Sequence, residues 1–396
     1  MELNTEQEKA LSLAIERYKN REVYTYIAGS AGTGKSTLVQ FIISALNLTP
    51  DRDVCYVAYT GKAALNLQRK NCPNACTLHS LLYNARQNKE TGLYHFIPKP
   101  IGNLKYKLIV VDEISMVTQE MWTLLLQHHI HIIALGDIAQ LPAIGATNEI
   151  LDKPHIVLTE IMRQEADSEI IQIATLAREH KEIPFMKGQQ VQVIKASEYR
   201  DAMLDWADMT ICATNNFRNQ LNKTARERIW GAPDLPPQKG DKIVCLHNEW
   251  DYETGVGDVL VNGLVGYINS DPVFKDTPPL YKKYCPKQLY FDFIPDFRID
   301  EENKEHAIFR KMNADYKILT EGVPTVNQKN FKFIPKVLRP KQFDYAYAMS
   351  CWKCQGSEYG KVLLFEENFP SGEAHWQYLY TGITRAVDRL VLVRKS

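Results

Sequence analysis

One glycine-rich segment of the chain has the residue types and spacing that bind phosphate. Residues Gly29–Ser36 read GSAGTGKS and match the pattern G-x-x-x-x-G-K-[ST] in full. Glycines let backbone N–H groups turn toward a phosphate, and a helix that starts after the loop adds the positive end of its dipole. In this pattern Lys35 reaches the β- and γ-phosphates of ATP and Ser36 holds Mg²⁺. The residues expected to contact ATP here are Gly29, Ala31, Gly32, Thr33, Gly34, Lys35, Ser36 and Thr37.

A second segment could supply the acids for hydrolysis. Leu108–Glu113 reads LIVVDE, an apolar run that ends in two carboxylates. Asp112 suits a position beside Mg²⁺, and Glu113 could polarise the attacking water. Many strands end in acids, so this pair gains its weight from the complete phosphate-binding loop that precedes it. The adjacent glutamate fits attack by water better than transfer to a bound acceptor.

Both segments fall within an alternation of strand-like and helix-like runs. Helix-like stretches such as Thr37–Leu46 and Gln119–Gln127 separate short β-branched stretches. The β-branched stretches are Val23–Ala28, Val54–Tyr59, Leu108–Asp112, His131–Gly136 and Ile156–Leu158. Such alternation predicts parallel βαβ units in a doubly wound α/β layer.

The same α/β signal recurs later in the chain around a stretch of different composition. Met209–Ala213 and Arg389–Val393 are strand-like, whereas residues 230–340 are rich in proline, glycine and aromatic residues, which predicts a β-rich insertion. Earlier in the chain, the turn-like segment KETG at Lys89–Gly92 has aromatic neighbours and predicts a short β-hairpin. A surface loop is the open alternative. We assign residues 1–83 and 108–188 to the first domain, 84–107 to the hairpin, 189–235 and 341–396 to the second domain, and 236–340 to the β-rich insertion.

The composition is that of an ordinary folded protein. The 396 residues are 45% hydrophobic and 24% charged, which excludes a largely disordered or collagen-like chain. Lys and Arg total 47, and so do Asp and Glu, so a polyanion must bind in a local groove. Apolar runs are far shorter than the roughly 20 residues that span a bilayer, and the polar N-terminus does not read as a signal peptide. We expect a protein without a membrane partner, in the cytoplasm of a bacterial or phage-infected cell or otherwise intracellular.

Five further segments occur in a fixed order along the chain. With the phosphate-binding loop and the acidic strand end they resemble the motif series of superfamily 1 helicases, most of all the RecD-like and phage Dda-like branch. The segments are Tyr59–Ala64 (YTGKAA), Thr77–Leu82 (TLHSLL), Gly136–Pro142 (GDIAQLP), Cys351–Glu358 (CWKCQGSE) and Tyr380–Ala386 (YTGITRA). The resemblance implies two RecA-like P-loop domains, an insertion in the second that is SH3-like in part, and 5′-to-3′ polarity.

The resemblance also implies roles for residues around the nucleotide. Gln7 matches a glutamine that reads adenine, although a polar residue on an amphipathic helix is a serious alternative. Gln140 matches the glutamine that senses the γ-phosphate, and Arg163 and Arg385 match two cations that converge on it. Gly356 and Glu358 are also placed among the nucleotide contacts.

Contacts to a DNA strand are implied in both domains. The expected DNA-binding residues of the first domain are Thr60, Lys62, His79 and, on the hairpin, Phe96 as a wedge. Those of the second domain are Thr214, Asn215, Trp352, Lys353 and Ser357. Trp352 stands where this branch commonly has histidine, so it could stack on a base or simply pack in the interior. Two cysteine pairs, Cys72 with Cys76 and Cys351 with Cys354, leave a zinc site as a weaker alternative.

The resemblance implies an ATP-dependent DNA helicase that moves on single-stranded DNA and unwinds duplex in replication, recombination or repair. ATP and Mg²⁺ are the expected ligands, and single-stranded DNA with an adjoining fork is the expected track. The chain carries its own candidate catalytic arginines, so we expect a monomer, to which a replication or recombination protein could dock. Two alternatives stay open: a nucleic-acid binding protein switched by ATP, and a phosphotransferase that acts on a small molecule.

Overall fold

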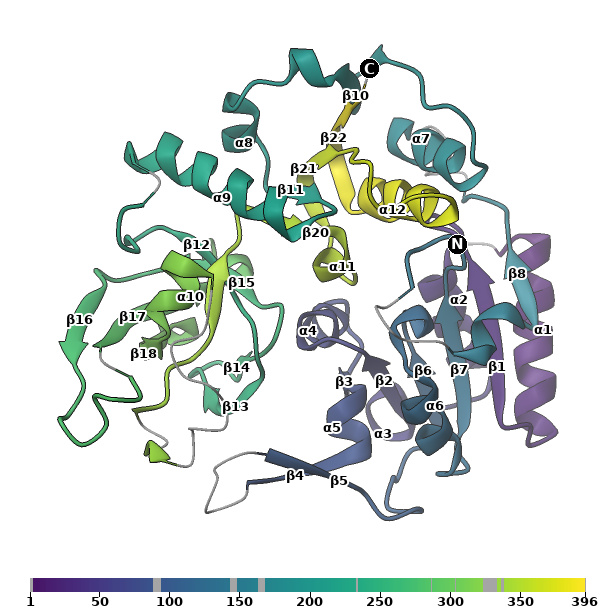
Figure 1. Ribbon diagram of the computed structural model, residues 1–396. Coiled ribbons are helices and arrows are strands. Elements are labelled where there is room, and N and C mark those ends of the chain that lie inside the picture. The colour runs from purple at the N-terminus through teal and green to yellow at the C-terminus, as the bar shows by residue number, and fades with distance from the viewer. Residues whose placement is uncertain are drawn as a thin grey trace.

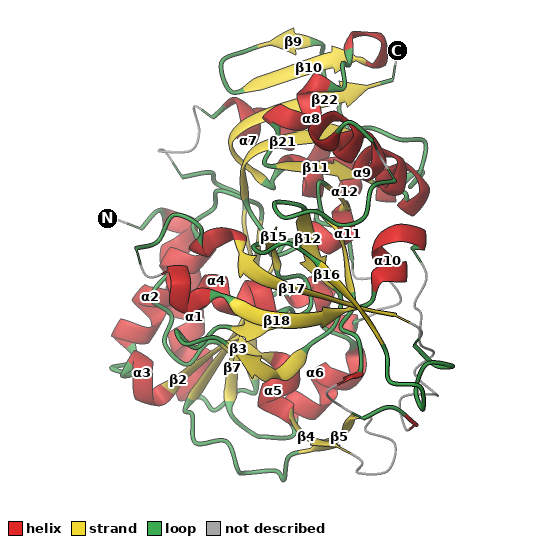
Figure 2. Ribbon diagram, turned by 90° about the vertical axis from the view of Figure 1, so that its left-hand side faces the viewer, coloured by secondary structure: helices red, strands yellow, loops and turns green. Residues whose placement is uncertain are grey.

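Two α/β lobes and a β-rich body make up the chain (Figure 1). The computed structural model describes residues 3–87, 94–142, 148–162, 168–232, 234–285, 287–302, 304–322, 333–335 and 338–395. Seen from the side of the β-rich body, the second lobe lies above the first and the strands of the β-rich body lie in front of their junction (Figure 2). Within the described residues, none of the helices has the length and apolar character needed to span a bilayer.

The first lobe is built on a parallel sheet with helices on both faces. Its strand order is β3-β2-β6-β7-β1-β8, and its strands are β1 (Tyr24–Gly29), β2 (Val54–Ala58), β3 (Cys76–Thr77), β6 (Leu108–Val111), β7 (His131–Gly136) and β8 (Ile156–Leu158). The central strands are buried on both faces, which explains their continuous apolar sequences. The helices are α1 (Thr5–Lys19), α2 (Lys35–Ala45), α3 (Pro50–Asp53), α4 (Gly61–Arg69), α5 (Leu78–Leu82) and α6 (Gln119–Leu126).

A second sheet forms the other lobe. Its strand order is β20-β11-β21-β22-β10-β9, in which β9 alone runs antiparallel to its neighbour. The strands are β9 (Met186–Lys187), β10 (Val191–Lys195), β11 (Met209–Cys212), β20 (Ala348–Ser350), β21 (Tyr359–Phe365) and β22 (Ala386–Arg394). The helices are α7 (Glu169–Arg178), α8 (Ala202–Trp206), α9 (Asn215–Trp230), α11 (Cys351–Cys354) and α12 (Glu373–Ile383).

The boundary between the lobes differs from the expected one. We expected the first domain to extend to residue 188, but α7 packs in the core of the second lobe and β9 pairs with β10. The apolar stripe of α7, formed by Ile170, Ile173, Ala174 and Ala177, has helical spacing and is buried in that core. Such a stripe predicts that a helix is buried, but it does not say against which sheet.

The β-rich insertion is an antiparallel sheet with a core of its own. The order is β16-β17-β15-β12-β19, with β18 also paired to β17, and the strands are β12 (Lys242–Cys245), β15 (Val265–Ile268), β16 (Val273–Asp276), β17 (Lys287–Pro295), β18 (Phe309–Ala314) and β19 (Phe343–Tyr345). A small pair, β13 (Glu249–Glu253) with β14 (Val259–Leu260), and helix α10 (Tyr316–Glu321) complete it. Residues 343–345, which we expected in the second domain, pair with β12 and so extend the insertion beyond residue 340.

A hairpin leaves the first lobe after α5. Its strands β4 (Tyr83–Gln87) and β5 (Tyr94–Pro98) pair in antiparallel fashion, with Ala85 opposite Phe96. The Phe96 side chain is 47% exposed. In Figure 1 the hairpin extends from the bottom of the first lobe toward the β-rich body.

Candidate functional site

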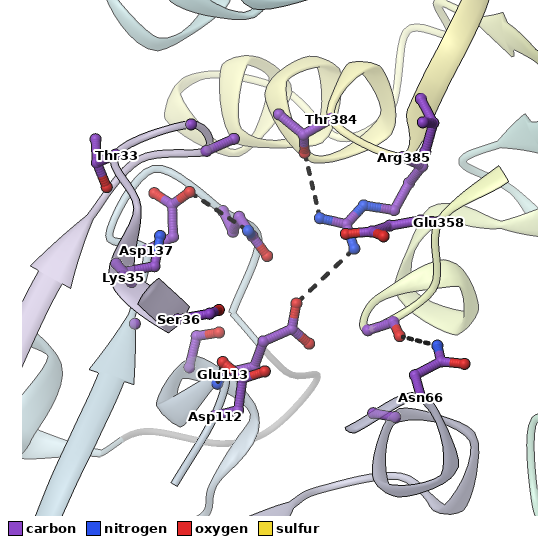
Figure 3. Close-up of a pocket in the computed structure, with 18 of the residues that line it drawn as sticks. Thr33, Lys35, Ser36, Asn66, Asp112, Glu113, Asp137, Glu358, Thr384 and Arg385 are labelled. Atoms are coloured by element: carbon purple, nitrogen blue, oxygen red, sulfur yellow. Dashed lines mark hydrogen bonds and ion pairs between the residues drawn. The ribbon is translucent and has the colours of Figure 1, made fainter. Parts of the chain in front are cut away.

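A cavity of about 650 Å³ lies between the two lobes and is lined by residues of both. The first lobe contributes the loop Ala31–Thr37 together with Asp112, Glu113 and Gln140, and the second contributes Gly356, Glu358 and Arg385. Figure 3 shows the loop and the two acids facing Arg385 and Glu358 across this space. Its volume is typical of a site for a small molecule or cofactor.

The glycine-rich segment forms a turn between β1 and α2. Gly34 precedes α2 with a φ of 74°, a left-handed conformation that favours glycine. Gly29 lies behind the cavity lining, where an added Cβ would come within 2.7 Å of the Thr33 hydroxyl oxygen. The Lys35 ammonium donates to the backbone carbonyls of Gly29 (2.6 Å) and Ser30 (2.9 Å). The loop therefore holds its cation inside the turn, at the N-terminus of a helix, as an anion site requires.

Two carboxylates follow β6 at the floor of the cavity. Burial raises the pKa of Asp112, with Lys35 acting in the opposite direction. Burial also raises the pKa of Glu113 to about 7, and Asp112 adds to that shift while Arg385 and Lys35 oppose it. Glu113 has a φ of 51°, a left-handed conformation that costs a non-glycine residue of order 1–3 kcal/mol. A carboxyl with a pKa near neutrality, held in a strained backbone, has the properties of a general base.

Arg385 reaches the same place from the second lobe. It follows α12 and is 5% exposed, with its guanidinium donating to the backbone carbonyls of Thr381 (3.1 Å) and Ser357 (3.2 Å). Its Nη1 lies 3.8 Å from Glu113 Oε1, an ion pair that crosses between the lobes (Figure 3). A guanidinium braced in this way can stabilise charge on a phosphate bound between the loop and itself.

The oxygen donors of the site fit Mg²⁺. Ser36 and Asp112 offer a hydroxyl and a carboxylate to the cavity. Mg²⁺ is usually held by one or two protein carboxylates together with phosphate oxygens and water. No group of three His, Cys, Asp or Glu side chains in the described part of the chain could hold a metal ion by itself. An ion here would therefore take most of its ligands from a bound triphosphate.

The cysteines considered for zinc are divided between two cores. Cys351 and Cys354 are buried in the core of the second lobe. Cys72 packs in the first lobe, and Cys76 lies beside Cys55 with their sulfur atoms 3.7 Å apart. The two pairs therefore do not come together as one site.

One residue expected at the nucleotide, Gln7, is placed differently from the rest. Gln7 is fully buried and does not line the cavity. Its Nε2 donates to the Thr33 carbonyl (3.0 Å), and its Oε1 accepts from the Asn4 amide (3.1 Å) in the cap of α1. Gln7 thus braces the back of the loop. Arg163 lies outside the described residues.

Comparisons with known proteins find matches over both lobes. The family model of the AAA domain matches residues 2–198, and that of the UvrD-like helicase C-terminal domain matches residues 345–393. The ATP-dependent DNA helicase Dda of Enterobacteria phage T4 is 30% identical over 291 residues, which cover 69% of this chain and 62% of Dda. The ATP-dependent RecD2 DNA helicase of Deinococcus radiodurans is 34% identical over 156 residues, which cover 37% of this chain and 21% of RecD2. These matches are consistent with the superfamily 1 helicases of the Dda and RecD type.

The chain spans less than two thirds of the length of these curated relatives. Solved structures with the same fold align with almost the whole length of this chain. The Pif1 helicase of Candida albicans covers 99% of this chain and 94% of its own at 20% identity, with a TM-score of 0.51. The Pif1 of Bacteroides bound to single-stranded DNA covers 99% and 92% at 15% identity, with a TM-score of 0.53. The predicted fold class, two RecA-like domains with a β-rich insertion, is confirmed.

The residues of the first domain that we expected to contact a DNA strand lie at the cavity, against the insertion and at the base of the hairpin. Thr60 lines the nucleotide cavity and its hydroxyl accepts from the Ala63 amide, which caps α4. Lys62 is 7% exposed, and its ammonium lies 3.8 Å from Asp296 of the insertion. His79 and Phe96 come together, with ring centroids 6.1 Å apart. The hairpin is thus attached to α5 through an aromatic contact.

The candidates of the second domain lie around the N-terminus of α9 and along α11. The Thr214 hydroxyl donates to Glu367 (2.7 Å) and accepts from the Phe217 amide, whereas Asn215 is exposed. Trp352 packs partly against the core, and its ring lies 6.2 Å from that of Phe369. Lys353 is exposed, whereas Ser357 is buried and offers its carbonyl to Arg385.

Sequence reasoning missed several polar residues that connect the two lobes. Asn66 Nδ2 donates to the Gly356 carbonyl (3.3 Å), and the Thr381 hydroxyl accepts from the Leu141 amide (2.8 Å). Tyr380 contacts both Asp137 and the phosphate-binding loop. The available signal was position, because Tyr380 and Thr381 belong to the segment YTGITRA that also carries Arg385.

Proposed function

We propose that the protein is an ATP-dependent DNA helicase that translocates on single-stranded DNA with 5′-to-3′ polarity and separates duplex at a fork. The observation that carries the proposal is the cavity between the lobes, where Arg385 faces Glu113 and the phosphate-binding loop. One lobe supplies the loop and the acids, and the other supplies the guanidinium. Hydrolysis at such a seam is coupled to the relative position of the lobes, which a phosphotransferase with a one-lobe site does not need.

The site suggests how each group acts. Lys35 and the backbone amides of the loop would bind the phosphates, and Glu113 would accept a proton from the attacking water. Ser36 and Asp112 would hold Mg²⁺, which neutralises charge on the phosphates when bound. Arg385 would stabilise charge that develops on the γ-phosphate and draw the second lobe toward the first. ATP then favours closure, and product release favours opening.

The DNA track is proposed to run across both lobes and to meet the hairpin at the fork. Names and titles of relatives support it: Dda and RecD2 are called ATP-dependent DNA helicases, and a Bacteroides Pif1 structure is described as bound to single-stranded DNA. Phe96, exposed on β5, is the proposed wedge. Because one chain supplies both halves of the cavity, we propose that a monomer is active, with a replication or recombination protein as an additional partner.

The test is strand displacement on duplexes that carry a single-stranded tail at the 5′ or the 3′ end. Displacement from the 5′-tailed substrate only, with ATP and Mg²⁺, is expected. Glu113→Gln should abolish turnover and retain ATP-dependent binding of single strands. Phe96→Ala should impair displacement while DNA-stimulated ATPase persists. Displacement from 3′-tailed DNA only would overturn the polarity, and full ATPase without any displacement would leave an ATP-switched binding protein.

A further inference from the structure

The hydroxyl of Tyr380 connects the two lobes inside the site. Tyr380 lies on α12 of the second lobe and is 2% exposed. Its hydroxyl donates to Asp137 Oδ2 (2.6 Å) and accepts from the backbone N–H of Ala31 (2.8 Å). Ala31 is part of the phosphate-binding loop and lines the cavity, so a residue of one lobe binds the loop of the other.

The same carboxylate also holds Gln140. Gln140 Nε2 lies 3.4 Å from Asp137 Oδ2, the oxygen that accepts from Tyr380. The next residue, Leu141, is held by two more groups of the second lobe: Thr381 accepts from its amide, and Gln355 donates to its carbonyl (2.5 Å). The second lobe therefore makes hydrogen bonds to both ends of the segment Asp137–Leu141.

The direction of this hydrogen-bond chain is fixed by the chemistry of a phenol. Burial and Asp137 raise the pKa of Tyr380, so the hydroxyl stays protonated and has one proton to donate. That proton goes to the carboxylate, and the oxygen is left as an acceptor for the Ala31 amide. Loop amides of this kind are the groups that bind phosphate oxygens. A phosphate that approaches this amide competes with the phenol oxygen for it.

A neighbouring tyrosine on α12 provides the contrast. Tyr378 is also buried, but its hydroxyl donates to the Phe365 carbonyl (2.5 Å) within the second lobe. Both hydroxyls satisfy a buried polar group, which is all that stability requires. Only the Tyr380 hydroxyl does so across the seam, on an atom of the phosphate-binding loop.

We propose that Tyr380 is a positioning residue that couples occupation of the phosphate-binding loop to the contact between the lobes. Its hydroxyl competes with the nucleotide phosphate for the Ala31 amide, while its bond to Asp137 fixes the segment that carries Gln140. When nucleotide binds, the phenol oxygen leaves the loop amide, and the contacts between α12 and the segment Asp137–Leu141 change as a result. This role in coupling rests on the proposed function, whereas the competition at the loop does not.

The test compares Tyr380→Phe with the control Tyr378→Phe. Without the competing oxygen, Tyr380→Phe should bind ADP and a non-hydrolysable ATP analogue several-fold more tightly by calorimetry. It should lower the KM for ATP and also lower kcat, because Asp137 and Gln140 lose their support. The ratio of single-strand Kd values with and without the analogue should move toward one. Tyr378→Phe should lower the Tm but leave the nucleotide Kd, the KM and this ratio unchanged.

Calorimetry needs no DNA, so it separates this inference from the helicase proposal. If Tyr380→Phe binds nucleotide more tightly but the wild-type protein displaces no strand, the competition for the Ala31 amide is supported and the helicase proposal is contradicted. Equal nucleotide Kd values for the two tyrosine variants would overturn the inference even if displacement is robust. Asp137→Asn, which weakens the acceptor of the phenol proton without changing its shape, is a second variant. It should also bind the nucleotide more tightly, and an unchanged Kd would count against the inference.

Discussion

The Glu113 side chain is 22% exposed and lines the cavity, so its carboxyl is partly buried and can still face a water molecule. Glu113 has a left-handed backbone two positions after the end of β6, and burial raises the pKa of its side chain to about 7. A base must be deprotonated, so its activity is expected to rise as pH passes through that value. For stability the sign is opposite: a raised carboxyl pKa stabilises the fold at low pH, and this contribution is lost as pH rises through about 7.

The pH dependence of DNA-stimulated ATPase checks this prediction. The value of kcat/KM should fall below about pH 7, because this parameter reports groups of the free enzyme. Glu198→Gln is a matched control, since Glu198 is an exposed carboxyl that pairs with Lys187. It should leave the acid limb in place. A limb at roughly pH 4 to 5, the ordinary range of a glutamate, would contradict the role given to Glu113.

At the scale of elements, α4 has two working faces. Thr60, Ala63, Asn66, Leu67 and Lys70 line the nucleotide cavity. The other face contacts the β-rich insertion through Gly61 on Val261, Lys62 on Asp296 and Arg69 on the Phe297 ring, which lies 4.7 Å from the guanidinium. One helix thus touches both the nucleotide site and the insertion.

The fit of Gly61 against the insertion gives a prediction about α4. An added Cβ at this position would lie 2.4 Å from Val261 Cβ, so Gly61→Ala must push the insertion away. Overpacking of this kind costs about 1–3 kcal/mol, and the Tm should fall by a few degrees. The clash is with the Val261 side chain, so the same substitution should cost little in a Val261→Gly background. Equal losses of Tm in both backgrounds would show that the loss does not come from the clash with the Val261 side chain.

Local motifs explain which parts of the site the sequence could predict. The phosphate-binding loop, Asp112 with Glu113, and Arg385 each carry their signal in adjacent residues, and the fold brings them to one cavity. Partners far apart in sequence carry no such signal. Lys62 is an example, because its acidic neighbour Asp296 belongs to a part of the insertion that carries no recognised motif. The stripe of α7 was equally uninformative, since burial against either sheet needs the same apolar residues.

At the scale of the whole molecule, the seam between the lobes is closed by groups that a nucleotide would bind. Arg385 pairs with Glu113, Tyr380 binds the Ala31 amide, and Asn66 binds the Gly356 carbonyl. Separation of the lobes therefore breaks contacts at the site itself. The position of the lobes and the occupation of the site depend on the same atoms, which is the condition for reciprocal coupling.

Removal of the cross-lobe cation tests that coupling in the intact protein. Arg385→Ala should lower kcat by roughly 10³-fold or more, because it removes positive charge from the γ-phosphate. It should also weaken closure, since the analogue would no longer be held from both sides. Small-angle scattering should then show a smaller decrease in radius of gyration on addition of the ATP analogue than in the wild type. Arg389→Ala, an exposed arginine on β22, should retain both the turnover and the decrease. A variant at Arg385 that closes and turns over like Arg389→Ala would mean that the nucleotide is held by one lobe alone.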